Sequence, residues 1–171
     1  PVAVDGYGLM RVFIAATLPQ LVELHRTGKL SPRDGSTFAV TPALREWYTD
    51  GDADELEYAA LIEAARASLG MLTADPTAPR RRAVVTADVD DAVPDAILGR
   101  AGVQLAEPVH IERVASLYVD AGDAEETVRA ATEAYDAAGH GDEDAMIAVE
   151  EPEGFELLWY ATQELPDLLH T

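Results

Sequence analysis

The chain has 171 residues, of which 32 are Asp or Glu and 12 are Lys or Arg, so its formal net charge is −20. This charge disfavours generic binding to nucleic acids and anionic membranes, and the absence of cysteine excludes disulfides, thiolate catalysis and zinc–thiolate sites. No apolar run is long enough to span a bilayer, and residues 1–9 lack the features of a signal peptide, so we expect a soluble cytoplasmic protein.

Hydrophobic periodicity predicts a mixture of strands and helices along the chain. We expect strands over residues 11–16, 36–40, 80–87, 103–109, 114–119 and 146–149, and helices over residues 17–28, 41–50, 54–72 and 123–138. Thr17 and Thr41 have the side chains and the sequence context of helix N-caps. Residues 155–165 fit a helix that ends at Pro166, with a strand over their first half as the alternative.

The longest predicted helix covers residues 54–72. Its apolar side chains recur at helical spacing and are expected to face the core. This stripe consists of Tyr58, Leu61, Ile62, Ala65, Leu69 and Leu72.

The alternation of strands and helices predicts an α/β (or α+β) fold, with a mixed, partly parallel sheet covered by helices. Right-handed crossovers would then link the first two strand–helix units. No linker is long enough to divide the chain, so we expect residues 10–171 to form one layered domain. Residues 1–9 precede the first strand, and we expect an N-terminal extension there that is disordered or derives from cloning.

Four polar residues directly follow predicted strands, namely Thr17, Thr41, Asp88 and Asp120. In open α/β sheets, ligands bind beyond the carboxyl ends of parallel strands, so these residues are the first candidates for a ligand site. Thr and Asp also cap helices and begin turns, which gives each of the four a purely structural alternative.

A second candidate is a site for a divalent cation such as Mg²⁺ or Ca²⁺. Its ligands would come from either of two places, namely Asp88 and Asp90 after one strand, or His140, Asp142 and Asp144 in an acidic loop. The loop lacks the length and spacing of an EF-hand, so an exposed acidic loop is the alternative. The sequence contains no dinucleotide-binding glycine motif, Walker A motif, serine-hydrolase elbow or zinc-protease motif, and no other cofactor is evident.

Two further groups of residues allow both a functional and a structural interpretation. The basic island at 80–82 would either bind an anionic ligand or pair with carboxylates of the same chain. The pairs Trp47–Tyr48 and Trp159–Tyr160 would either line an aromatic binding wall or anchor the core.

Several segments together carry a family resemblance: Arg11–Ile14, Val40–Tyr48, Leu56–Leu61, Pro79–Arg82, Gly141–Ala145 and Leu157–Leu168. In combination they resemble an uncharacterised family of short actinobacterial proteins without a known activity, from Met10 to the C-terminus. The resemblance implies a bacterial cytosolic protein, and it brings no ligand or catalytic residue.

The acidity has three interpretations. A GC-rich coding bias gives a solvated acidic surface, and the presence of a single lysine, Lys29, together with the family resemblance favours it. Adaptation to high salt gives a similar composition. An acidic mimic of a nucleic acid, or a docking surface for a basic partner, is the third interpretation.

Because no catalytic constellation is evident, the sequence favours a non-catalytic cytosolic module that binds a protein partner or a small molecule, as a monomer or a homodimer. The alternative is a metal-assisted hydrolase, which requires Asp88, Asp120 and Asp142 or Asp144 to converge in one cleft. A second alternative is an acidic nucleic-acid mimic that occupies a basic nucleic-acid-binding protein.

Overall fold

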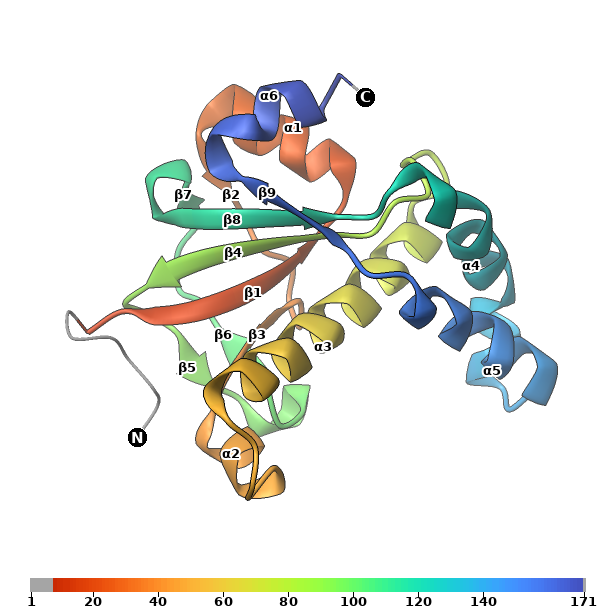
Figure 1. Ribbon diagram of the computed structural model, residues 1–171, viewed down its shortest axis with the longest axis horizontal. Coiled ribbons are helices and arrows are strands. Elements are labelled where there is room, and N and C mark those ends of the chain that lie inside the picture. Colours follow the sequence, from red (N-terminus) through yellow and green to blue (C-terminus); the bar gives the residue numbers. More distant parts are fainter. Residues whose placement is uncertain (1–7, 171) are drawn as a thin grey trace.

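A five-stranded sheet in the order β3-β1-β4-β8-β9 forms the centre of the structure (Figure 1). The computed structural model describes residues 8–170, so the expectation for residues 1–7 lies outside the described residues. The strands of this sheet are β1 (Met10–Ala16), β3 (Thr37–Ala39), β4 (Ala83–Val89), β8 (Val114–Val119) and β9 (Leu158–Ala161). Two short pairs lie outside it, β2 (Lys29–Leu30) with β7 (Val109–His110) and β5 (Val93–Pro94) with β6 (Val103–Gln104).

Every neighbouring pair in the five-stranded sheet is antiparallel, so the expectation of a partly parallel sheet was wrong. β1 and β3 are direct antiparallel neighbours, which also excludes the expected crossover between the first two strand–helix units. β3 and β4 do point in the same direction, because both run antiparallel to β1, but β1 lies between them. The mixture of helices and antiparallel strands corresponds to the α+β alternative.

The helices cover the two faces and one end of the sheet. They are α1 (Leu18–Thr27), α2 (Pro42–Trp47), α3 (Ala53–Ala74), α4 (Glu125–Gly139), α5 (Glu143–Glu150) and α6 (Leu165–Leu168). Single 3₁₀ turns are η1 (Ala96–Leu98), η2 (Ile111–Arg113), η3 (Gly122–Ala124), η4 (Glu151–Gly154) and η5 (Thr162–Glu164). Figure 1 shows α1 and α6 together at the top, α3 across one side of the sheet, and α4 and α5 at the right-hand end. No helix among residues 8–170 is long and apolar enough to cross a membrane.

The alternating side chains of β1 divide the core between two faces, as the period of a strand requires. Val12 and Ile14 pack in the cluster that includes Leu21 of α1, whereas Phe13 packs with Leu56 and Ala60 of α3. Both faces of the sheet are therefore covered by helices.

The buried face of α3 agrees with the predicted stripe at Ala65, Leu69 and Leu72, but it differs in the first half of the helix. Leu56, Ala60 and Ala64 are buried, whereas Tyr58 is 52% exposed. Small alanine side chains on the buried face let the helix approach the sheet closely, and the larger Tyr58 consequently faces outward.

Two predictions near the C-terminus were wrong. Residues 146–149 belong to α5 and not to a strand, because the Asp142 side chain accepts a hydrogen bond from the Ala145 N–H at 2.9 Å and begins a helix there. A run of four apolar residues is too short for its period to distinguish a strand from a helix. Residues 158–161 form strand β9 beside β8, so the strand alternative for residues 155–165 is correct in place of the helix.

Candidate functional site

The four residues that follow predicted strands lie at two opposite ends of the sheet, as measured along the strands. The last residues of β1 and β8 both pair with Ala83, the first residue of β4, so Thr17 and Asp120 lie at the same end of the sheet. Thr41 lies just after β3 and Asp88 is the last residue but one of β4, and the carboxyl ends of these two strands lie at the other end of the sheet. The expected common crevice therefore does not exist. A hydrolase site that needs Asp88 and Asp120 in one cleft is excluded by this topology.

Thr17 and Thr41 act as helix caps. The Thr17 N–H donates a hydrogen bond to Oε1 of Gln20 at 3.1 Å, as expected of a capping box. The Thr41 hydroxyl accepts from the Leu44 N–H at 3.2 Å and donates to the carbonyl oxygen of Arg100. Both threonines are buried. The Thr17 amide and the Thr41 hydroxyl are thus used within the fold, and Thr41 additionally ties α2 to the loop at Arg100.

Asp88 and Asp120 are both engaged by arginines, in very different environments. Asp120 is fully buried, and its carboxylate accepts from Nε of Arg82 at 2.8 Å and from Nη2 at 2.7 Å. Arg82 also donates to the carbonyl oxygen of Phe155 at 3.1 Å, so the pair joins β4, β8 and the segment before β9. Asp88 accepts from Nε of Arg11 at 2.7 Å on the surface, and this hydrogen bond raises the pKa of Arg11.

In the basic island at 80–82, only Arg82 pairs with a carboxylate of the same chain, that of Asp120, whereas Arg80 and Arg81 donate to main-chain carbonyl oxygens. Arg80 is buried, and its guanidinium donates to the carbonyl oxygens of Leu72 at 2.7 Å and of Ala78 at 2.8 Å, next to the C-terminal end of α3. Arg81 donates from Nε to the carbonyl oxygen of Asp120 at 2.9 Å. All three arginines of the island thus donate hydrogen bonds within the chain.

The two candidate groups of cation ligands lie in different parts of the fold. Asp88 and Asp90 lie at the carboxyl end of β4, whereas His140, Asp142 and Asp144 lie at the turn between α4 and α5, on the opposite side of Figure 1. Asp142 is the N-cap of α5, and Nδ1 of His140 lies 2.7 Å from a main-chain oxygen of α4. Across residues 8–170, no group of three or more His, Asp or Glu side chains is arranged to hold a metal ion.

A cleft of about 470 Å³ lies between α2, α3 and the loop at residues 99–101. We name it the aromatic cleft, and its lining residues are Leu44, Trp47, Tyr48, Glu55, Tyr58, Ala59, Ile62, Glu63, Arg66, Gly99, Arg100 and Ala101. Trp47 is 61% exposed and Tyr48 is 43% exposed. The interpretation of this pair as core anchors was therefore wrong, and an aromatic wall is what the structure contains.

Arg100 lies over one side of this wall. Its guanidinium carbon is 3.6 Å from the centre of the Trp47 ring, which is a cation–π contact. The loop that carries Arg100 is fixed by the Thr41 hydroxyl and by the hydrogen bond from the Ala39 N–H to the Ala101 carbonyl at 2.8 Å. Within residues 8–170, no carboxylate forms an ion pair with Arg100. Its N–H groups are available to an acceptor from outside.

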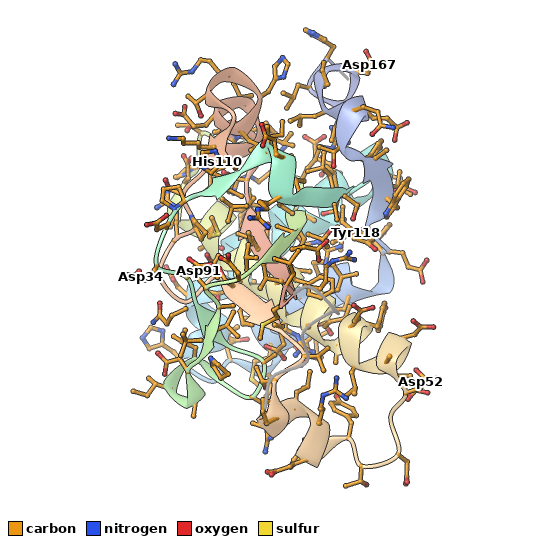
Figure 2. All side chains as sticks on the ribbon, turned by 90° about the vertical axis from the view of Figure 1, so that its left-hand side faces the viewer. Asp34, Asp52, Asp91, His110, Tyr118 and Asp167 are labelled. Atoms are coloured by element: carbon orange, nitrogen blue, oxygen red, sulfur yellow. The ribbon has the colours of Figure 1, made fainter. Side chains whose placement is uncertain are left out.

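Arg66, the other cation of the aromatic cleft, is already neutralised. It donates to Oε1 of Glu63 at 3.0 Å and to Glu153, and the hydrogen bond to Glu153 raises the pKa of Arg66. Asp52, labelled in Figure 2, caps the N-terminus of α3 by accepting from the Glu55 N–H at 2.8 Å. The part of α3 that lines the cleft is consequently fixed by the Asp52 cap at one end and by the Arg66 ion pairs at the other.

A second hollow of about 210 Å³ lies on the other side of the exposed ridge of α3. It shares Tyr58 and Ile62 with the aromatic cleft and is also lined by Tyr118, which Figure 2 labels, and by Phe155 and Leu157. Tyr58 and Ile62 therefore stand between two hollows. Both residues have the spacing of core residues, and no sequence pattern marks Arg100. The adjacent Trp47–Tyr48 pair is the only sequence signal for this site.

A family model described as "Family of unknown function (DUF6912)" matches residues 10–169. The chain belongs to DUF6912. The expected resemblance to an uncharacterised family without a known activity is thereby confirmed, while the actinobacterial origin of this DUF6912 chain stays a prediction. No curated protein and no solved structure matches the chain.

Proposed function

We propose that this chain is a non-catalytic cytoplasmic binding module that docks a partner protein at the aromatic cleft. One observation carries the proposal: Arg100 lies over the Trp47 ring in a cleft that the exposed Tyr58 also lines, and it forms no ion pair within residues 8–170. Trp, Tyr and Arg are the residues most enriched at the energetic centres of protein interfaces.

The geometry supports a partner that offers an apolar side chain and a hydrogen-bond acceptor. The apolar group would enter the hollow against Tyr58 and Ile62, and a main-chain carbonyl or a carboxylate would accept from Arg100. A cation–π contact contributes about 0.5–1 kcal/mol when exposed and about 2 kcal/mol when it is desolvated. A partner that covers Trp47 and Arg100 would thus strengthen a contact that the chain has already formed.

The chemistry of the lining supports binding over catalysis. The described lining residues include Glu55 and Glu63, but no histidine, serine or threonine that would serve as a base or a hydroxyl nucleophile. The volume also falls within the range of small-molecule sites, and a small organic ligand is the second candidate occupant. The large exposure of Trp47, at 61%, favours a protein, because a small ligand leaves the outer part of such a wall in water.

A second copy of the chain is a less favourable partner than a different protein. Each copy has a formal charge of −20, so two copies repel each other at long range. The homodimer expected from sequence stays a prediction, and light scattering of the purified protein tests it directly.

The proposal is tested by quantitative capture of proteins from a lysate of the cells that encode the chain. Trp47→Ala and Arg100→Ala are compared with Ile97→Ser, because Ile97 is 93% exposed and does not line the cleft. Truncation of an interface centre costs about 2 kcal/mol or more, so we expect a roughly thirtyfold loss of specific capture for the first two variants. Unchanged capture by Trp47→Ala, or turnover of ester, phosphoester or nucleotide substrates by the purified protein, would contradict the proposal.

A further inference from the structure

The negative charge of the chain is concentrated in one helical arm. We name residues 125–154, which form α4, α5 and η4, the acidic arm. It contains ten acidic residues and one arginine, whereas the rest of the chain contains 22 acidic and 11 basic residues. The single arginine, Arg129, already pairs with Glu125 at 3.1 Å. The arm therefore presents an excess of carboxylates that nothing within it balances.

Two large apolar side chains of α5 are exposed among these carboxylates. Met146 is 46% exposed and Ile147 is 58% exposed, on α5. Glu143 precedes them, and Glu150 follows them, at helical spacings of three or four residues, so all four lie on one face of the helix. Burial in the chain's own core does not explain this face, which consists of an apolar centre with a carboxylate at each end.

The internal packing of the arm uses different residues. Val128 and Ala131 of α4 pack against Leu69 and Leu72 of α3, and Val149 of α5 joins the same cluster. Figure 1 shows α5 at the outer end of the molecule, away from the sheet. The face with Met146 is thus not needed to hold the arm on the domain.

We propose that the outer face of α5 docks a basic amphipathic segment of a partner protein. Its apolar residues would cover Met146 and Ile147, and its lysines or arginines would lie over Glu143 and Glu150. Charge complementarity selects this occupant, because nucleic acids, anionic membranes and a second copy of the acidic arm are all repelled. The proposal rests on the composition and exposure of the arm, and it is independent of the aromatic cleft.

The exposed face of α5 predicts the sequence pattern of the partner segment. An exposed apolar pair flanked by charges three and four residues away is complementary to a helix that carries an apolar pair flanked by Lys or Arg. The electrostatic part of this recognition acts over about 10 Å at 0.1 M salt. Binding should therefore weaken as salt is raised, whereas contact with Met146 and Ile147 should retain the discrimination against a purely hydrophilic cation.

Fluorescence anisotropy with a labelled synthetic peptide tests the proposal on the full chain. The probe is a leucine–lysine amphipathic helix of about 18 residues, compared with an oligolysine of equal charge. We expect the leucine–lysine peptide to bind more tightly than oligolysine, and to weaken by about tenfold between 50 mM and 500 mM salt. Equal affinity for the two peptides, or affinity independent of salt, would overturn the proposal.

Matched variants locate the site on the arm. We expect Glu143→Gln with Glu150→Gln, and separately Met146→Ser with Ile147→Ser, each to weaken the leucine–lysine peptide by about fivefold or more. The control, Asp34→Asn with Glu112→Gln, removes the same charge from exposed positions outside the arm and should leave the affinity within about twofold. If the control weakens binding as much as the Glu143 and Glu150 pair does, overall acidity is responsible and the α5 site is refuted.

Discussion

The buried pair of Arg82 and Asp120 makes the most quantitative prediction of the structure. The two side chains are 4% and 0% exposed, and Asp120 accepts three hydrogen bonds from Arg82 at 2.7 or 2.8 Å. Asp120→Asn keeps the shape of the side chain, but it removes the charge and turns an amide N–H towards the guanidinium. Removal of one partner from a buried ion pair costs about 3–5 kcal/mol, out of roughly 5–15 kcal/mol for a typical domain.

Thermal and urea unfolding measure this loss, which corresponds to a drop in Tm of roughly 10 °C for a domain of this size. The control is Asp88→Asn, since Asp88 also lies 2.7 Å from Nε of an arginine, Arg11, but those side chains are 32% and 42% exposed. An exposed pair contributes less than about 1 kcal/mol.

A double replacement, Arg82→Met with Asp120→Leu, removes both charges together. It should be more stable than Asp120→Asn, because no unpaired charge stays buried. If Asp120→Asn and Asp88→Asn lower the free energy of unfolding equally, the structural role of Asp120 is refuted and it returns to the functional candidates.

Two further predictions concern single caps. Thr41→Val removes the acceptor for the Leu44 N–H and the donor to the Arg100 carbonyl, so urea unfolding should show a loss of about 1–2 kcal/mol; no loss would contradict the capping role. The side chain and N–H of Thr77 hydrogen-bond to Asp75 and lower its pKa, so this carboxylate stabilises the fold above its ordinary pKa, and the effect disappears as pH falls through the lowered pKa. Asp75→Ala should therefore lower Tm at neutral pH and have a smaller effect near pH 3, and an equal effect at both would contradict it.

The sequence predicted the parts of the fold that depend on local chemistry. The strand at residues 114–119 and the caps at Thr17 and Thr41 lie where hydrophobic period and cap residues placed them. Strand direction was not predictable in this way. It depends on whether each connection starts the next strand at the same end of the sheet or at the opposite end. The helices α2 and α3 connect β3 to β4, which lies on the other side of β1. β3 and β4 therefore point the same way, and each is antiparallel to β1, its neighbour in the sheet.

The candidate site was less accessible to sequence analysis for a related reason. A sequence gives the type of a side chain, but its exposure depends on which face of the helix the rest of the chain covers. Tyr58 has the spacing of a core residue, yet Ala60 and Ala64 are the residues that pack on the sheet. Arg100 reaches Trp47 from a loop that is tied to Thr41 across 59 positions of sequence and to Ala39 by a main-chain hydrogen bond, and no local pattern predicts such contacts.

Site-specific photo-crosslinking tests most directly whether the aromatic cleft is a docking surface. A photoreactive phenylalanine analogue replaces Tyr58, in the wall of the cleft, or Ile97, which is exposed but does not line the cleft. In a lysate of the cells that encode the chain, our account predicts a discrete crosslinked protein from position 58 and none from position 97. It also predicts that Arg100→Ala abolishes the product from position 58. Equal products from both positions, or no product from position 58, would contradict the account.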